Sequence, residues 1–238
     1  ILGYFDDKFN LNANLKLIIL TFLILILLII DQNLIIKNIQ LSFLKQNLIL
    51  NNFGILFTLF CFLVFMNALN MFDGINLQSF IFYFVNFLFL LINGTYFMPI
   101  IILLLIPLLV FSYLNFKNLA FLGDNGTYIL ALILGYLLVK FHNNTEIYNS
   151  IDVVNFLFLP IIDSLRVIFE RQMKNKAIFL PDNTHIHHKL LEKYNYKITI
   201  KALTLMILFP HVLYYLGLNY FITLFFQIFI YFYILRKK

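Results

Sequence analysis

The chain has 238 residues, of which 62% are hydrophobic and 12% charged, with a formal net charge of +6 and a mean hydropathy of +0.91. A soluble domain is roughly 45–50% apolar, with about a quarter of its residues charged. These values exclude an ordinary soluble globule and predict a protein whose surface is largely surrounded by lipid. The single cysteine, Cys61, excludes an internal disulfide.

Eight apolar runs of roughly 16–18 residues follow one another along the chain, and such runs are just long enough to cross a hydrocarbon layer of about 30 Å. They are residues 15–30, 53–69, 77–92, 97–114, 126–141, 153–169, 200–216 and 219–235. Residues 34–50 mix apolar side chains with Asn, Gln and Lys, which predicts an amphipathic surface element or a hairpin. The expected fold class is all-α: a polytopic membrane protein with about eight transmembrane helices in one domain, residues 1–238.

The distribution of basic residues predicts the orientation of these spans. Eight spans place both ends of the chain on one side of the membrane. All of the 17 Lys and Arg residues except Lys37, Lys45 and Lys140 fall on that side. Because basic loops are retained in the cytoplasm, we expect this side to be cytoplasmic.

The unusual polar residues of the chain gather on the same side. They form four clusters, which are Asp6-Asp7, residues 67–76, residues 123–126 and residues 181–188. Carboxylates close to hydrocarbon are costly, so several of them at one interface indicate an ion or phosphate site. The predicted active site therefore lies in the cytoplasmic loops.

The residue types in these clusters suit phosphate chemistry. Carboxylate and Asn oxygens at a membrane interface are suitable ligands for Mg²⁺, which takes one or two carboxylates together with substrate phosphates. Gly123 and Gly126 open the run at 126–141, where the N–H groups of a helix start can face an anion. The histidines of residues 185–188, with Arg171 nearby in sequence, would contact a diphosphate.

Each pattern alone also has a simpler explanation. Asp6-Asp7 could be a solvated pair, and Asp73-Gly74 is a common turn signal. Asp163, Arg166 and Glu170 are spaced by three and four residues, which a structural ion-pair ladder on one helix face explains well. The joint placement of the clusters on one side of the membrane is what favours a site.

The four clusters, in this order, resemble the polyprenyl-phosphate N-acetylhexosamine-1-phosphate transferase family, and its WecA/TagO-like branch more than its MraY-like branch. The family's Asp-Asp pair before a span is similar to Asp6-Asp7, and its Asn-x-x-Asn-Met-x-Asp-Gly stretch is similar to residues 67–74. Its Gly-Asp-x-Gly turn is similar to residues 123–126. Its Pro-Asp-x-x-His-x-His-His loop is similar to residues 181–188, and the Ile between the histidines favours the WecA/TagO-like branch.

The resemblance implies an enzyme that transfers a HexNAc 1-phosphate, with GlcNAc as the default sugar, from a UDP-sugar to polyprenyl phosphate and releases UMP. It implies a bacterial cytoplasmic membrane location and Mg²⁺, with Mn²⁺ as the alternative cofactor. The resemblance also implies a role for each site residue. Asp124 and Asn70 would hold the metal, Asp6 and Asp7 would hold the metal or the lipid phosphate, and Asp73 would support that shell. His185, His187, His188 and Arg171 would clamp the diphosphate, and Asn67 and Asn76 would bind substrate, with Asn76 reading the uracil. A homodimer stays open, and no nucleic-acid partner is expected.

Two departures from the family pattern keep other functions open. A second Asp-Gly is usual three residues after the first, where this chain has Asn76-Leu77, and Asn183 stands where Arg is common. Members also carry further spans before the Asp-Asp pair, so we expect this chain to lack its N-terminal spans. A catalytically inactive relative is one alternative. An ion-coupled transporter is another, although it should carry polar residues near the middle of the membrane.

Overall fold

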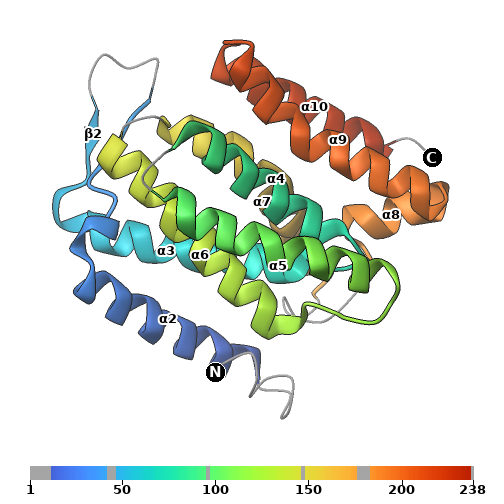
Figure 1. Cartoon of the computed structure of the whole chain (residues 1–238), viewed down its shortest axis with the longest axis horizontal. Coiled ribbons are helices and arrows are strands. Elements are labelled where there is room, and N and C mark those ends of the chain that lie inside the picture. Colours follow the sequence, from blue (N-terminus) through green and yellow to red (C-terminus); the bar gives the residue numbers. More distant parts are fainter. Residues whose placement is uncertain (1–11, 42–46, 95–96, 146–147, 176–182, 237–238) are drawn as a thin grey trace.

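The computed structural model describes residues 12–41, 47–94, 97–145, 148–175 and 183–236. This part of the chain is a bundle of helices with one small hairpin (Figure 1). The long helices are α2 (Ala13–Ile30), α3 (Gly54–Phe72), α4 (Gln78–Asn93), α5 (Met98–Phe116), α6 (Gly123–Thr145), α7 (Ser150–Met173), α9 (Tyr196–Tyr215) and α10 (Tyr220–Arg236). The short elements are α8 (Ile186–Lys193), the 3₁₀ helices η1 (Gln32–Leu34) and η2 (Asn51–Phe53), and the strands β1 (Asn38–Ile39) and β2 (Leu48–Ile49).

The prediction of an all-α polytopic membrane protein is confirmed, since a helix covers each of the eight apolar runs. In the part of the chain that the structure describes, five helices are long and apolar enough to cross a membrane, and α4 and α10 are apolar but shorter. The remaining helix, α7, is 24 residues long and carries several charged side chains. Large apolar side chains point outward, as Phe22, Leu103 and Phe225 do with 63–71% of their surface exposed. Such a surface requires lipid around it.

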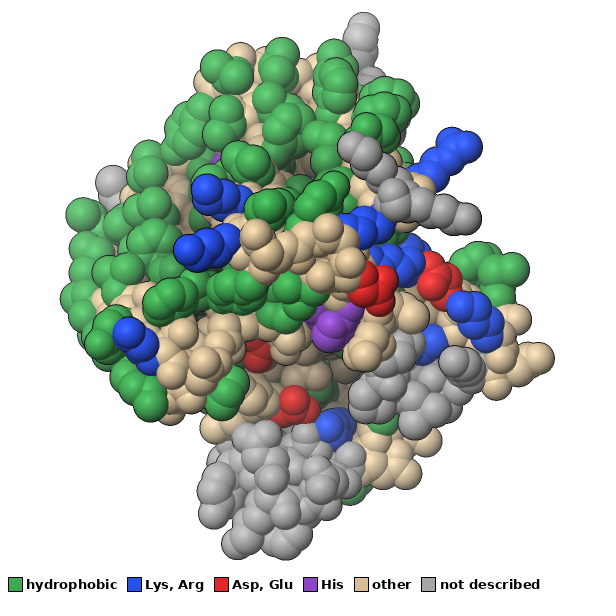
Figure 2. All heavy atoms as spheres, turned by 90° about the vertical axis from the view of Figure 1, so that its right-hand side faces the viewer, with side chains coloured by type: hydrophobic (Ala, Val, Ile, Leu, Met, Phe, Trp, Pro, Cys, Tyr) green, Lys and Arg blue, Asp and Glu red, His purple; other side chains and the backbone are tan. Residues whose placement is uncertain are grey.

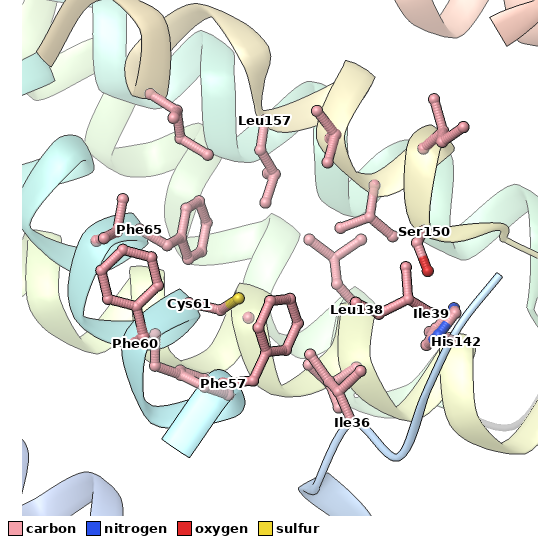
Figure 3. A pocket seen from close by; sticks show the side chains of 18 of the residues that line it. Ile36, Ile39, Phe57, Phe60, Cys61, Phe65, Leu138, His142, Ser150 and Leu157 are labelled. Carbon is pink, nitrogen blue, oxygen red and sulfur yellow. The ribbon is translucent and has the colours of Figure 1, made fainter. Parts of the chain in front are cut away.

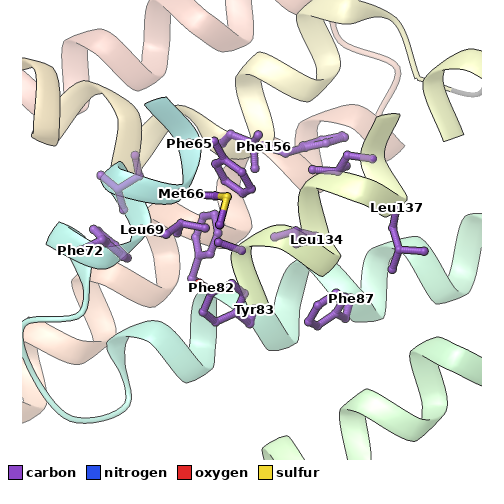
Figure 4. Close-up of a cluster of buried hydrophobic side chains, with 14 of the residues drawn as sticks. Phe65, Met66, Leu69, Phe72, Phe82, Tyr83, Phe87, Leu134, Leu137 and Phe156 are labelled. Atoms are coloured by element: carbon purple, nitrogen blue, oxygen red, sulfur yellow. The ribbon is translucent and has the colours of Figure 1, made fainter. Parts of the chain in front are cut away.

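Helix α3 lies inside the bundle and packs against α2, α6 and α7, while α4 packs against α5, α6 and α9 (Figure 1). Bulky side chains fill the space between these helices. Figure 4 shows the cluster, in which Phe65 and Phe72 of α3 lie close to Phe82 of α4 and Leu134 of α6. The rings of Phe72 and Phe82 meet edge to face, with their centroids 5.9 Å apart. This packing fixes the ends of α3, α4 and α6, where the polar clusters lie.

The segment predicted as an amphipathic element or a hairpin is a hairpin. Strands β1 and β2 pair antiparallel, with Asn38 opposite Ile49 and Ile39 opposite Leu48. Both ring nitrogens of His142, near the end of α6, bind backbone oxygens: Nδ1 lies 2.9 Å from Tyr148 O and Nε2 lies 3.1 Å from Asn38 O. His142 therefore ties the first strand of the hairpin to α6 and to the residues that lead into α7.

We expect His142→Ala to loosen this end of the molecule. The substitution removes the ring N–H that donates to one of these carbonyl oxygens, and an unsatisfied buried polar group costs about 1–3 kcal/mol. Amide hydrogen exchange should speed up in β1 and β2, and the unfolding temperature in detergent should fall. Asn144→Ala is the control, because Asn144 is exposed on the same turn of α6. Equal effects of the two substitutions would contradict this role of His142.

Candidate active site

The polar ends of several helices come together at one end of the bundle. Asn67 and Asn70 lie in the last turns of α3, Asp124 lies in the first turn of α6, and Arg171 lies in the last turn of α7. Figure 2 views this end and shows acidic, basic and histidine side chains gathered between apolar flanks. Of the predicted site residues, Asp6 and Asp7 lie outside the described residues. Those that are described come from α3, α6, α7, α8 and the loop that joins α3 to α4.

Two carboxylates of this end are close enough for their charges to interact. Asp73 caps the end of α3. Burial raises the pKa of Asp73 above its usual value, and the negative charge of Asp124 raises it further. Lys16 of α2 donates a hydrogen bond from Nζ to Oδ2 of Asp124 at 3.0 Å. The structure thus brings together two of the acids that the sequence predicted and supplies a cation beside one of them.

The two asparagines of α3 differ in their contacts. Asn70 donates from Nδ2 to Thr127 Oγ1 at 3.0 Å, and Tyr83 of α4 donates to the carbonyl oxygen of Thr127 at 2.9 Å. These bonds fix the start of α6 against α3 and α4, which holds the turn that carries Asp124. Asn67 instead donates back to Leu63 O of its own helix at 2.8 Å. The substrate-binding role of Asn67 stays a prediction.

The loop between α3 and α4 is held in place by hydrogen bonds with residues of other segments. Leu77 has a backbone φ of +66°, and its N–H donates to Asn115 Oδ1 at 2.7 Å. Asn76 donates from Nδ2 to Asn118 Oδ1 at 2.5 Å, and its carbonyl oxygen accepts a bond from the Tyr196 hydroxyl at 2.9 Å. A left-handed backbone is easy for glycine and costs a leucine about 1 kcal/mol. The chain therefore has, at Leu77, a backbone shape that a glycine would adopt without strain.

His187 of α8 anchors the histidine segment onto this loop. Its side chain is buried with 1% exposed, and its Nδ1 lies 3.3 Å from Nε2 of Gln78. A Cβ at Gly74 would collide with the His187 imidazole, so the glycine makes room for the ring. Burial lowers the pKa of His187 to about 3, and the charges of His188 and His185 lower it further. The ring is therefore neutral at pH 7, and it joins α8 to the loop after Asp73.

Gly74→Ala is expected to destabilise the protein by about 1–3 kcal/mol, because the added methyl group overpacks a filled space. Activity should fall with it, since the collision displaces either the loop after Asp73 or α8. The check is a thermal-unfolding cycle of Gly74→Ala, His187→Ala and the double variant. The double variant should lose clearly less than the sum of the single losses, because the methyl group then has room. Strict additivity would contradict the steric argument.

His185 is held by residues that the sequence indicated only as an ion-pair ladder. Its Nδ1 lies 2.7 Å from Asp163 Oδ2, and the backbone N–H of Ile186 donates to Asp163 Oδ1 at 3.0 Å. Arg166 donates to Asp163 Oδ1 at 2.9 Å, to Glu170 Oε1 at 2.6 Å and to Thr184 O at 2.6 Å. The ladder exists, and it also fixes the entry into α8. The spacing by three and four residues could have pointed to these groups, but not to their histidine partner.

The other predicted clamp residues lie close by. The rings of His185 and His187 are parallel with centroids 5.5 Å apart, and His188 lies 4.3 Å from His187. Arg171 is buried with 5% exposed. The structure therefore brings the three histidines together, and their contact with substrate stays a prediction.

The donor set at this end fits a hard divalent cation. Asp73 and Asp124 offer carboxylate oxygens whose mutual repulsion a cation would relieve. The bond to Thr127 uses the nitrogen of the Asn70 amide rather than its oxygen, which is the atom that binds metal. Among the described residues no group of three or more acidic, histidine or cysteine side chains surrounds one point. Mg²⁺, which takes one or two carboxylates together with substrate phosphates, stays a prediction.

An apolar pocket of about 310 Å³ lies along α3, α6 and α7 and under the first strand of the hairpin (Figure 3). Phe57, Phe65, Leu138 and Leu157 line it. On α3 the pocket ends at Phe65, two residues before Asn67, and on α7 it ends at Ile161, two residues before Asp163. The pocket thus extends through the apolar part of the bundle towards the polar end.

The fold and this end define a multi-pass membrane protein with a site of carboxylates, asparagines and histidines at one end of its bundle. The chain belongs to the family described as Glycosyl transferase family 4, which matches residues 1–142. The resemblance drawn from the motifs is confirmed.

Curated relatives carry names from the same family. The chain is 24% identical over 198 residues to the probable undecaprenyl-phosphate N-acetylglucosaminyl 1-phosphate transferase of Bacillus subtilis (strain 168), over 80% of this chain and 55% of that protein. It is 23% identical over 200 residues to the undecaprenyl-phosphate alpha-N-acetylglucosaminyl 1-phosphate transferases of Salmonella typhi and Salmonella typhimurium, over 79% of this chain and 54% of each of them. The chain spans about half the length of the curated relatives it matches.

Proposed function

We propose that the protein transfers a HexNAc 1-phosphate, with GlcNAc as the first candidate sugar, from a UDP-sugar to undecaprenyl phosphate or a similar polyprenyl phosphate. The observation that carries this proposal is the meeting of Asp73, Asp124 and the histidines of residues 185–188 at one polar end of a membrane bundle. Acids that hold a cation, with imidazoles beside them, suit a substrate of anionic phosphates. The names of the relatives support the same activity.

The apolar pocket supports an amphiphilic acceptor. A polyprenyl phosphate joins a long apolar chain to a charged head group. The pocket ends on α3 and on α7 within two residues of polar side chains of the site, Asn67 and Asp163. The prenyl chain would lie against residues such as Phe57 and Leu157 while its phosphate reaches the polar end.

The reaction forms one P–O bond and breaks another. A phosphate oxygen of the lipid attacks the β-phosphorus of the UDP-sugar, and UMP leaves with the electron pair of the broken bond. The second pKa of a phosphomonoester is about 6, so the attacking oxygen is already ionised at neutral pH and needs no general base. The main barrier is the repulsion between two anions. Mg²⁺, when bound, would neutralise phosphate charge.

The side chains of the site would hold and orient the two substrates. Asp124 and the oxygen of Asn70 would hold the cation, and Asp73 would support them. Asp6 and Asp7 would hold the cation or the lipid phosphate. Arg171 and the histidines at 185, 187 and 188 would clamp the diphosphate, and Asn76, whose amide is held by Asn118, would read the uracil.

The departure at Asn76-Leu77 does not argue for an inactive relative. Leu77 has a left-handed backbone, and its N–H donates to Asn115 Oδ1. The loop after Asp73 is therefore formed with a leucine at this position, at a modest cost in strain. With most Lys and Arg on the side of the polar end, we infer that the site faces the cytoplasm of a bacterial cell and that the protein lies in its cytoplasmic membrane.

A transfer assay tests the proposal. Membranes from cells that express the full open reading frame are mixed with undecaprenyl phosphate, Mg²⁺ and radiolabelled UDP-GlcNAc. We expect UMP release and label in the lipid phase, both lost with EDTA and restored by Mg²⁺ or Mn²⁺. Silence with UDP-GlcNAc and with every other UDP-HexNAc donor, in membranes that contain the protein, would refute the proposal.

A further inference from the structure

The two oxygens of the buried Asp163 carboxylate have different hydrogen-bond partners. The Asp163 side chain is 1% exposed. Oδ1 accepts three hydrogen bonds, from Arg166 at 2.9 Å, from the Tyr231 hydroxyl at 2.8 Å and from the N–H of Ile186 at 3.0 Å. Within the described part of the chain, Oδ2 has one partner, Nδ1 of His185 at 2.7 Å. The first oxygen joins α7, α8 and α10, and the second contacts a histidine of the candidate site.

The contact with Oδ2 decides which nitrogen of His185 carries a proton. An ionised carboxylate only accepts hydrogen bonds, so the nitrogen 2.7 Å away must donate and therefore holds its hydrogen. Nδ1 keeps this hydrogen in the neutral ring as well as in the charged ring. Nε2 is then the nitrogen that is open to another partner.

The ring of His185 is also held in place. It is buried with 6% exposed and lies parallel to the His187 ring, which packs on Gly74. The bond from Arg166 to Thr184 O fixes the backbone just before His185. A ring whose position is set by packing and whose tautomer is set by a carboxylate is oriented in advance for one partner.

We propose that Asp163 is a positioning residue for the transfer reaction, which holds His185 with its proton on Nδ1 so that Nε2 contacts the phosphates of the substrates. This inference rests on the proposed transferase function. Asp163 itself touches no reacting atom. Its part is comparable to that of any carboxylate that orients a functional histidine through the far ring nitrogen.

Asp163→Asn tests the proposal with little change in shape. The three donors around Oδ1 require the amide oxygen of the new side chain to occupy that place. The amide NH₂ then points at Nδ1 of His185, which can accept its hydrogen bond only by giving up its own proton. The substitution therefore moves the proton of the neutral ring from Nδ1 to Nε2.

Enzyme kinetics measures the effect of this proton shift on turnover, and NMR measures the position of the proton itself. We expect Asp163→Asn to lower kcat by about 10–100-fold, with KM changed much less and the protein still present in membranes. The ¹⁵N signals of the His185 ring, in protein labelled with ring-¹⁵N histidine and assigned with His185→Gln, should change from the Nδ1-protonated to the Nε2-protonated pattern.

Tyr231→Phe is the matched control, because it removes the hydroxyl that donates to Oδ1 and accepts from Arg166 Nε, and it leaves the bond from His185 to Oδ2. It should lower thermal stability while kcat stays within about threefold and the histidine tautomer is unchanged. Equal losses of kcat in the two variants, or a His185 ring that keeps its proton on Nδ1 in Asp163→Asn, would overturn the proposal. The NMR result needs no turnover, so an inactive wild-type protein would refute the proposed function while the tautomer still decides the role of Asp163.

Discussion

Asp124→Asn is expected to lower sugar-phosphate transfer by on the order of 10³-fold or more while the protein still inserts into membranes. The substitution keeps the shape of the side chain and removes its charge beside Asp73, where the negative charge of Asp124 acts on a buried carboxylate. Groups that stabilise charge in a transition state contribute about 10²–10³-fold each. Loss of a metal ligand also removes the charge of the metal.

The loss of transfer activity in Asp124→Asn must be distinguished from the effect of breaking the ion pair between Asp124 and Lys16. Asp31→Asn is the matched control, because Asp31 accepts a hydrogen bond from Lys140 at 2.9 Å at the opposite end of the bundle. Both substitutions remove a partly exposed carboxylate from a lysine, and Lys140 is the more buried of the two lysines, so Asp31→Asn is at least as demanding for stability as Asp124→Asn. We expect transfer by Asp31→Asn to stay within about twofold of wild type.

Binding of Mg²⁺ gives a second readout that does not depend on turnover. A cation that binds only the folded state raises the unfolding temperature. Mg²⁺ should therefore stabilise the wild-type protein and Asp31→Asn in detergent, and it should have a much smaller effect on Asp124→Asn. Substantial transfer by Asp124→Asn, or an equal response of all three proteins to Mg²⁺, would refute the assignment of Asp124 to a metal.

The spans and the hairpin could be predicted from the sequence because both depend on local patterns. A run of apolar residues long enough for the bilayer leaves few alternatives to a helix. The polar residues of 34–50 excluded a further span, and the pairing of Asn38 with Ile49 agrees with the hairpin alternative. The side chains that hold the hairpin, His142 above all, could not be predicted, because their partners are carbonyl oxygens of distant residues.

The candidate site could be predicted only as far as the membrane topology places residues on the same side of the membrane. Asp73 and Asp124 were expected together because both fell at ends of spans on the same side, and their charges do interact. The fine arrangement depends on packing between helices. No spacing in the sequence shows that Gly74 makes room for His187, since the two residues are 113 positions apart.

Two residues illustrate structural features that could not be predicted from the sequence. Leu77 is a departure from the family pattern, and its φ of +66° is a backbone shape that glycine adopts more easily than leucine. Asp163 was explained by its spacing from Arg166 and Glu170, and these ion pairs exist. Its bond to His185 could not be predicted, because a pattern along one helix contains no information about the helix that packs beside it.

The two ion pairs of Arg166 lead to the second large effect, which is on stability. Arg166 pairs with Asp163 at 2.9 Å, where both side chains are at least nine-tenths buried, and with Glu170 at 2.6 Å, where the carboxylate is 32% exposed. Removal of one partner of a buried pair leaves a buried charge without compensation, which costs about 3–5 kcal/mol. An exposed pair contributes about 0–1 kcal/mol. Arg166→Met should therefore destabilise the protein far more than Glu170→Gln.

Unfolding of the detergent-solubilised protein, followed by heat or by pulse proteolysis, measures both variants. The double variant Arg166→Met with Asp163→Asn is the decisive comparison. It removes the cation together with the charge that the cation compensates, so it should recover part of the loss of Arg166→Met. Equal losses for Arg166→Met and Glu170→Gln, or a double variant that loses the sum of its parts, would mean that the network contributes little to the fold. The bond between Asp163 and His185 would then be the main reason for a carboxylate at this position.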